Sequence, residues 1–139
     1  MIEPIYKQES YDVMGACFEV YKEMGAGFVE PIYHECLERE MNYRRIPFVH
    51  HAGLALRYKG EPLKLNYEAD FVTHSKIVLE IKAVKRLDDS YRVQLLNYLR
   101  ATGFQLGLLV NYGRVGGLKW ERVVRSEWLS SRAQNPAIT

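Results

Sequence analysis

The sequence predicts an α/β or α+β fold, with a mixed central sheet covered by helices. Three observations support this prediction. A stretch with apolar residues at helical spacing comes first, over residues 10–24, and a second predicted helix follows over residues 29–44. Three strand-like segments separated by short turns follow, between residues 54 and 84. A helical stretch and a short apolar run come next, which is the order expected of a parallel crossover.

Two helices are expected at the start of the chain. The first is predicted over residues 10–24, with Ser10 as its N-cap and Gly25 as its end. The second is predicted over residues 29–44, and Pro31 falls in its first turn, where proline is tolerated. Both helices are expected to pack on the sheet.

The rest of the chain alternates between strands and one further helix. A helix is predicted to follow Asp88-Asp89-Ser90, which offers N-caps, and to end at Gly103. Strands are predicted over residues 54–58, 65–73, 76–84, 106–111 and 119–124. Turns are expected at Lys59-Gly60 and at His74-Ser75. We expect one domain over residues 1–128 and a flexible tail over residues 129–139.

The composition is that of a globular protein and excludes several classes. The 139 residues are 47% hydrophobic and 26% charged, and the net charge of +2 is too small to indicate nucleic-acid binding by itself. No apolar run is long enough to predict a membrane span. Cys17 and Cys36 form no CxxC pair, which excludes a four-ligand structural zinc site. The absence of a secretory signal pattern leads us to expect a cytoplasmic location.

The strand predicted over residues 76–84 carries the main candidate site. Its two faces are both mostly apolar, which indicates a central strand, yet Glu80 and Lys82 lie side by side on one face. Burying a charge is costly unless the charge is paired or bound to metal. The alternative is a Glu–Lys pair on a solvent-facing edge, and such surface pairs are common.

Asp70 strengthens the interpretation of Glu80 as a functional residue. A hairpin between the strands at residues 65–73 and 76–84 would bring Asp70 close to Glu80. Two carboxylates beside a lysine form a hard-oxygen site of the kind that Mg²⁺ prefers. The lysine can orient the attacking water and offset charge that develops on a phosphate. Taken alone, Asp70 would be interpreted as a turn or edge-strand residue.

Asp70 followed by Glu80-Ile81-Lys82 resembles the D…(D/E)xK signature of the PD-(D/E)xK nuclease superfamily. Gln94 and Tyr98, four residues apart on one helix face, resemble the QxxxY motif of its RecB-like branch. Without this context they would be a surface amide and a half-buried tyrosine.

The segment 27–33 resembles the motif that gives its name to the GxxExxY family of small PD-(D/E)xK-like proteins. The matching residues are Gly27, Glu30 and Tyr33. Residues 45–48, 58–60 and 107–113 also resemble sequences of this family, so the resemblance covers about residues 10 to 124. Gly27 is expected to serve a backbone bend and Tyr33 to pack in the core.

The resemblance implies a restriction-endonuclease-like core with the order α-β-β-β-α-β. It implies that Asp70, Glu80 and the backbone carbonyl of Ile81 bind Mg²⁺ or Mn²⁺, and that Lys82 positions the nucleophilic water. Gln94 and Tyr98 would support the site. Glu30 would bind metal through water or hold a second ion, although an acid near a helix start is also favoured by the helix dipole.

Two residues depart from the pattern that the resemblance leads us to expect. Glu68 stands where a basic residue often precedes the Ala-Asp pair, and it would share a strand face with Asp70. Tyr91 stands where histidine is expected at the start of the QxxxY helix. Both changes bear on substrate preference and rate more than on metal binding.

Basic and aromatic residues provide a second, weaker indication of nucleic-acid binding. Two basic groups can contact a phosphate backbone, although most of their members are expected to be solvated surface charges: Lys82, Lys85, Arg86, Arg92 and Arg100, and Arg114, Lys119, Arg122 and Arg125. Tyr112, Trp120 and Trp128 could stack on bases, but packing is the commoner role. His50-His51 resembles a metal pair. Neighbours on a strand point to opposite faces, so we expect neither to be a ligand.

The function expected from these observations is metal-dependent hydrolysis of a phosphodiester, in DNA more than in RNA. Two alternatives remain open: a nucleic-acid-binding module that keeps the fold without turnover, and a subunit that acts only with a homo-oligomeric or other protein partner. No membrane partner is expected. The sequence does not decide between single and double strands or between endonuclease and exonuclease action.

Overall fold

A computed structural model describes residues 4–125 of the chain. The predicted tail over residues 129–139 and Trp128 lie outside the described residues. The helices are α1 (Lys7–Met24), α2 (Glu30–Tyr43) and α3 (Asp89–Thr102). The strands are β1 (Phe48–Tyr58), β2 (Glu61–Thr73), β3 (Ile77–Lys82), β4 (Leu106–Asn111) and β5 (Lys119–Val124). Within residues 4–125, no helix combines the length and the apolar character that crossing a membrane requires.

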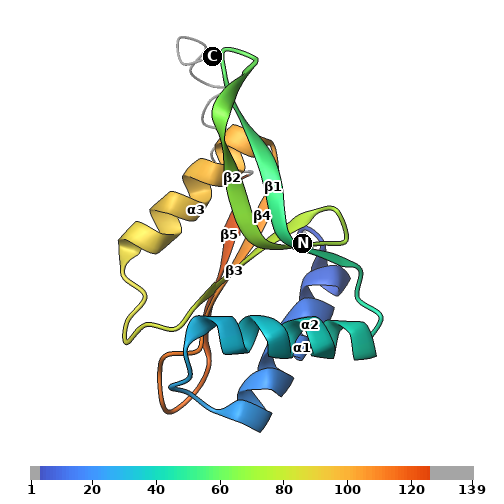
Figure 1. Cartoon of the computed structure of the whole chain (residues 1–139), viewed down its shortest axis with the longest axis vertical. Coiled ribbons are helices and arrows are strands. Elements are labelled where there is room, and N and C mark those ends of the chain that lie inside the picture. Colours follow the sequence, from blue (N-terminus) through green and yellow to red (C-terminus); the bar gives the residue numbers. More distant parts are fainter. Residues whose placement is uncertain (1–3, 126–139) are drawn as a thin grey trace.

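The strands form one mixed sheet in the order β1-β2-β3-β4-β5. Strands β1, β2 and β3 form an antiparallel meander, and β5 runs antiparallel to β4. Strands β3 and β4 are parallel and are connected through α3, which confirms the predicted crossover. The long β1–β2 hairpin projects beyond the rest of the sheet (Figure 1).

Helices cover both faces of the sheet (Figure 1). One buried cluster joins residues of α1 and α2, such as Val13 and Tyr33, to Leu79 of β3. A second cluster joins Leu95 of α3 to Val78, the neighbour of Leu79 on β3. Strand β3 is therefore buried on both faces, as its apolar sequence predicts, and every polar side chain that it carries is held close to the core.

The start of α1 corrects the predicted N-cap. The helix begins at Lys7, and its N-cap residue Tyr6 has a φ of 52° and no side-chain cap. Ser10 lies inside the helix and is buried, where its hydroxyl donates to the Lys7 carbonyl at 3.1 Å. It also accepts from Arg122 at 2.9 Å. Ser10 thus connects α1 to β5 because it faces the sheet, and it is not available at the helix terminus.

The hairpin of β1 and β2 is longer than the alternation of apolar residues predicted. On β1 the prediction missed residues 48–53, which pair with β2 from Phe48↔Thr73 onward. On β2 it missed residues 61–64, which are exposed and complete the hairpin at Tyr58↔Glu61. The turn lies at Lys59-Gly60 as predicted, with φ values of 51° and 83°. Positive φ at both central residues is typical of a two-residue hairpin turn.

The remaining element boundaries agree closely with the sequence. Asp88 caps α3 by accepting from the Ser90 backbone at 2.9 Å, and Gly103 ends it with a φ of 91°. Strands β4 and β5 span the predicted residues. The chain beyond β3 is held by Asn111, whose amide oxygen accepts from the Val84 N–H at 2.9 Å and whose amide nitrogen donates to the Val84 carbonyl at 2.8 Å.

Candidate active site

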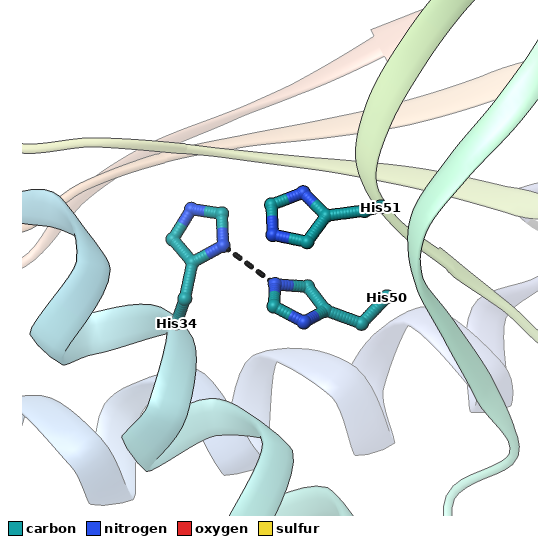
Figure 2. Close-up of side chains that lie close together, drawn as sticks. All are labelled: His34, His50 and His51. Carbon is teal, nitrogen blue, oxygen red and sulfur yellow. Dashed lines mark hydrogen bonds between the residues drawn. The ribbon is translucent and has the colours of Figure 1, made fainter.

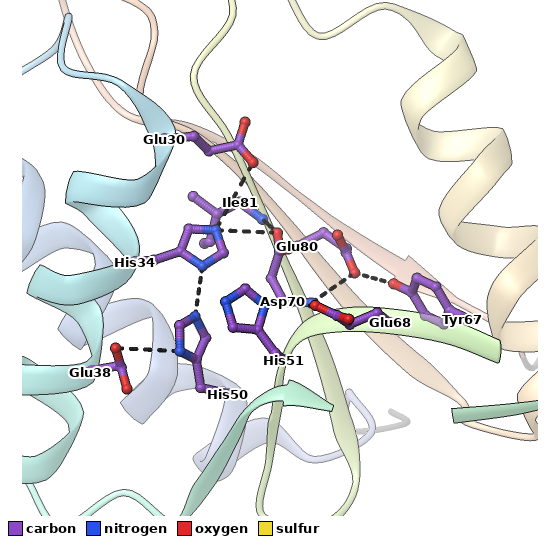
Figure 3. Close-up of polar contacts among 10 residues, drawn as sticks. All are labelled: Glu30, His34, Glu38, His50, His51, Tyr67, Glu68, Asp70, Glu80 and Ile81. Carbon is purple, nitrogen blue, oxygen red and sulfur yellow. Dashed lines mark hydrogen bonds and ion pairs between the residues drawn. The ribbon is translucent and has the colours of Figure 1, made fainter. Parts of the chain in front are cut away.

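Asp70 and Glu80 lie opposite each other where strands β2 and β3 separate. The last pair of their ladder is Phe71↔Leu79, so Asp70 and Glu80 are the next positions in register. Glu80 Oε1 accepts from the Asp70 backbone N–H at 3.3 Å, and Asp70 Oδ2 accepts from the Ile81 N–H at 2.7 Å (Figure 3). The predicted hairpin therefore brings both carboxylates together.

The two carboxylates nevertheless point to different sides of the sheet, because β2 is irregular at Asp70. Ala69 packs in the cluster beneath α3, whereas Phe71 packs in the cluster beneath α1 and α2. Residues two apart on a regular strand share a face. His51 lies opposite Asp70 on β1, and this position is missing from the ladder although His50↔Phe71 and Ala52↔Ala69 are paired. The φ of His51 is 54°, which is far from the value of an extended strand. The irregularity turns Asp70 toward α2.

Glu80 lies on the α3 side of the sheet, in a small cavity shared with most of the predicted site. The cavity is lined by Tyr67, Glu80, Lys82, Tyr91, Gln94 and Tyr98, together with two leucines. Gln94 and Tyr98 of α3 thus lie on the same side as Glu80 and Lys82, as the QxxxY spacing predicts. Burial, with Asp70 as the next contribution, raises the pKa of Glu80 to about 8.

Lys82 and Tyr91 contact each other in this cavity. The Lys82 ammonium lies over the Tyr91 ring, 5.3 Å from its centroid. An aromatic face attracts a cation through its quadrupole, so Tyr91 orients the lysine at the position where the sequence pattern suggested histidine. Tyr91 therefore replaces the expected histidine with an aromatic ring that contacts Lys82.

Asp70 lies in a second cavity, of about 360 Å³, between α2 and β1. Its Oδ2 is 3.7 Å from His34 Nε2, which is 4.0 Å from Glu30 Oε1 (Figure 3). Glu30 is the first residue of α2, as predicted, and burial raises its pKa. Glu30, His34 and Asp70 offer ligand atoms that all lie within 4.8 Å of one another. Glu30 is thus placed to act as an outer or second-metal ligand.

The donor set fits a divalent cation that prefers oxygen. Asp70 and Glu80 are carboxylates on directly opposed backbone positions, and their proximity is one cause of the raised pKa of Glu80. A cation between two crowded carboxylates relieves their repulsion. The two carboxylates interact with each other although they lie on different sides of the sheet, and Mg²⁺ or Mn²⁺ binds through such oxygen ligands.

Comparison with protein families decides the assignment. Residues 7–123 match the family described as the PD-(D/E)XK nuclease superfamily. The chain belongs to this superfamily. No curated protein matches the sequence at a significant level.

Two solved structures share the fold of this PD-(D/E)XK protein. The crystal structure of SSO0001 is 19% identical with a TM-score of 0.50, covering 86% of this chain and 58% of its own. An alkaline exonuclease from Laribacter hongkongensis is 13% identical with a TM-score of 0.52, covering 96% of this chain and 77% of its own. The chain thus spans little more than half the length of SSO0001. These likenesses confirm the restriction-endonuclease-like core.

Some basic residues of this PD-(D/E)XK chain form hydrogen bonds that hold the fold together, whereas others line a surface cavity. Arg92 is bound by Glu121 at 2.9 Å and Asp89 at 2.5 Å, and half-buried Arg122 donates to Ser10 and to the Ile5 carbonyl. Both therefore hold the fold together. Four others line one cavity of about 250 Å³: Lys85, Arg86, Arg114 and Lys119. The two predicted basic groups thus meet at one surface.

Sequence reasoning missed Tyr67, and its expectation that the side chains of His50 and His51 point to opposite faces is wrong. Tyr67 donates a hydrogen bond from its hydroxyl to Glu80. On a regular strand Tyr67 and Asp70, three residues apart, would point to opposite faces, so no contact between Tyr67 and the site was expected. The ring centroids of His50 and His51 lie 3.8 Å apart, because the positive φ of His51 turns its side chain to the side of His50. Glu68 also reaches this group, 2.9 Å from His51.

Proposed function

We propose that this chain is a metal-dependent nuclease that hydrolyses phosphodiester bonds in nucleic acid, DNA in preference to RNA. The observation that carries the proposal is the opposition of Asp70 and Glu80 at the end of the β2–β3 ladder, with Lys82 two residues beyond Glu80. This is the spatial arrangement that the D…(D/E)xK signature of its superfamily requires. The chain's own membership of that superfamily adds support.

In this proposal Asp70, Glu80 and the Ile81 carbonyl hold Mg²⁺ or Mn²⁺, and Glu30 is an outer or second ligand. When bound, such an ion lowers the pKa of water and polarises the phosphoryl oxygen. The half-buried carboxylates are suited to this role because both are placed by strand backbones rather than by loops.

Lys82 orients the water and offsets negative charge on the phosphate. It projects from β3 on the face of Glu80, and its contact with Tyr91 limits the directions that its ammonium can take. Gln94 and Tyr98 act as positioning residues from α3, since both line the cavity that holds Glu80 and Lys82. In hydrolysis the water oxygen bonds to phosphorus, the P–O bond to the leaving oxygen breaks, and the water proton ends on solvent or the leaving group.

The nucleic-acid backbone would follow the cavity that contains Lys85, Arg86, Arg114 and Lys119. Lys85 and Arg86 come three and four residues after Lys82, so this basic surface continues directly from the site. Trp120, which is 40% exposed, borders the same cavity and offers a ring for base stacking. Sequence-independent contacts of this kind suit a nuclease without base readout.

We further propose that the chain belongs to the GxxExxY group and the RecB-like branch of the superfamily. Gly27 has a φ of 105° at the bend before α2, where glycine is favoured. Glu30 faces Asp70, and Tyr33 is fully buried with its hydroxyl donating to the Gly25 carbonyl at 2.6 Å. Each residue of the motif thus has a separate physical role. The free thiols Cys17 and Cys36 support a reducing, cytoplasmic environment.

The proposal is tested by cleavage assays with the purified chain. Linear and circular DNA, single- and double-stranded, and RNA are incubated with Mg²⁺, Mn²⁺ or EDTA. We expect metal-dependent cleavage that is lost in Lys82→Ala and Asp70→Ala and retained in Lys64→Ala, which removes an exposed lysine of the hairpin. Circular dichroism verifies that each variant folds.

Two results would overturn the proposal. Retained cleavage in folded Lys82→Ala and Asp70→Ala would reject this site. Absence of cleavage by folded wild type that still binds metal would leave the binding module or the partner-dependent subunit, and the oligomeric state would then separate these two.

A further inference from the structure

Three of the four histidines of the sequence converge beside the candidate active site (Figure 2). His34 comes from α2, and His50 and His51 come from β1. His34 Nδ1 lies 2.8 Å from His50 Nε2, and one ring nitrogen of each histidine lies within 4.8 Å of the others. We propose that His34, His50 and His51 form a binding site for a transition-metal ion of the Zn²⁺ class.

The backbone of β1 is deformed in a way that this site requires. On a regular strand His50 and His51 would point to opposite faces. The φ of 54° at His51 instead places the two rings on one side, with centroids 3.8 Å apart. Residues other than glycine rarely adopt such a φ, and strained backbone of this kind is concentrated at functional sites. The deformation brings three imidazoles to one point.

A carboxylate lies near the other nitrogen of each of the three rings. Glu38 Oε1 is 3.3 Å from His50 Nδ1, and Glu68 Oε1 is 2.9 Å from His51 Nδ1. His34 Nε2 is 3.7 Å from Asp70 Oδ2 (Figure 3). Histidines that bind metals almost always donate their second ring N–H to such a partner.

The second nitrogens of the three rings converge: His34 Nδ1, His50 Nε2 and the His51 nitrogen that faces the other two rings (Figure 2). The first two share a hydrogen bond, which a bound ion would replace. Zn–N bonds of about 2.0–2.1 Å in a tetrahedron set nitrogens about 3.3 Å apart, so the 2.8 Å pair needs only a small separation. The site opens into the cavity of about 360 Å³, which leaves room for water as a fourth ligand.

The chemistry of the donors distinguishes this site from the carboxylate site. Imidazole nitrogen suits Zn²⁺, Co²⁺, Ni²⁺ and Cu²⁺, whereas Mg²⁺ prefers oxygen. His34 is shared by geometry between the two sites, because its other nitrogen faces Asp70 and Glu30.

The test is titration of the full chain with Co²⁺ in excess Mg²⁺, followed by visible absorption and equilibrium dialysis. We expect one Co²⁺ per chain, with the intense absorption of a low-coordinate nitrogen site, and displacement by Zn²⁺. His50→Ala and His51→Asn should each weaken binding by more than 10-fold. Asparagine is chosen because it tolerates positive φ at this position.

Three control variants make the test specific. His74→Ala removes the one histidine outside the cluster and should leave Co²⁺ affinity unchanged. Glu80→Gln, which impairs the carboxylate site, should also leave it unchanged. Glu38→Gln should weaken binding by about 10- to 100-fold through loss of the partner of His50.

Several outcomes would overturn the proposal. They are absence of Co²⁺ binding by wild type, affinity unaffected by His50→Ala and His51→Asn, or affinity lost with Glu80→Gln. Because Mg²⁺ is present throughout and cleavage is not measured, these outcomes are independent of whether the chain is a nuclease.

Discussion

The rings of Tyr67 and Tyr98 stack face to face, with centroids 3.8 Å apart and planes 4° apart. Tyr67 in turn donates its hydroxyl proton to Glu80. The tyrosine of the QxxxY motif therefore reaches the site through a second tyrosine on β2. The stack fixes the ring of Tyr67, and the fixed ring presents its hydroxyl to the carboxylate. Helix α3 thus positions a proposed metal ligand without touching the ion.

Tyr67→Phe should weaken metal binding and shift the pH dependence of cleavage. The hydroxyl favours the ionised form of Glu80, so its removal raises the pKa of Glu80 further. A hydrogen bond to a charged group is worth about 1.5–3 kcal/mol, which corresponds to about 10- to 100-fold in affinity. We expect weaker Mg²⁺ binding at pH 7 and a rate profile whose midpoint moves to higher pH.

Matched variants separate the hydrogen bond from packing. Tyr98→Phe keeps the stacked ring and should resemble wild type in pH profile, whereas Tyr98→Ala should resemble Tyr67→Phe. Tyr58→Phe, at the exposed end of β1, controls for general effects. An unchanged pH profile in Tyr67→Phe would show that Tyr67 does not act on Glu80.

The raised pKa of Glu80 predicts that the metal-free protein loses stability as pH rises. Glu80 has a pKa of about 8 in the folded chain and an ordinary value of 4.5 when unfolded. Between these values the folded state binds a proton that the unfolded state lacks, so the free energy of unfolding falls with increasing pH. Urea denaturation in EDTA should therefore give lower stability at pH 8.5 than at pH 7.

Glu80→Gln isolates this effect, because glutamine does not titrate. The difference in stability between pH 7 and pH 8.5 should be smaller in Glu80→Gln than in wild type. The contribution of His34, whose pKa is lowered, is present in both proteins and cancels in the comparison. Equal slopes in the two proteins would mean that Glu80 is already ionised at pH 7.

Local sequence patterns predicted most of the fold because each element carries its own signal. The apolar residues of β3 indicated burial on both faces, and Asp88 and Gly103 marked the ends of α3. The opposition of Asp70 and Glu80 was also predictable, since a hairpin with a short turn sets its register. Residues 48–53 of β1 and 61–64 of β2 were missed, and the second of these segments is exposed throughout and packs against no core.

The proposed histidine site and the contact of Tyr67 with Glu80 could not be predicted from the sequence, and the reason is the same for both. Both depend on the irregularity where His51 lies opposite Asp70, and a non-glycine residue with positive φ has no reliable sequence signal. Regular alternation of side chains along a strand therefore placed His51 on the face opposite to His50. It also placed Asp70 and Glu80 on one face, whereas they point to different sides of the sheet. Tertiary packing of β2 between two helical layers decided these positions.

The basic cavity beyond β3 predicts a salt-dependent contribution to nucleic-acid binding. Lys85→Ala combined with Arg86→Ala should weaken DNA binding and reduce the slope of log K against log salt by roughly 1–2, as expected for loss of one or two phosphate contacts. Fluorescence anisotropy in EDTA measures binding without cleavage. Arg39→Ala removes an exposed arginine of α2 that pairs with Glu35, and should leave the slope unchanged.

The contact between Gly113 and the end of β3 predicts a graded series of stabilities. A Cβ at Gly113 would lie 2.2 Å from the Val84 carbonyl oxygen and 2.4 Å from its nitrogen, which are backbone atoms held by Asn111. Gly113→Ala should therefore lower the free energy of unfolding by about 1–3 kcal/mol or more. It should also lower cleavage at temperatures where the chain is folded, because Val84 follows Lys82 on the same segment.

Two other glycines complete the series. A Cβ at Gly107 would meet only the side chain of Leu95, at 2.9 Å, so Gly107→Ala should cost less because a side chain can yield. Gly53→Ala should be close to neutral, since its nearest contact is 4.0 Å away. Urea denaturation of the three variants should rank them in this order. If Gly113→Ala were as stable as Gly53→Ala, the segment after β3 would not be fixed against the chain that follows β4, and Lys82 would lack the rigid support that its proposed role requires.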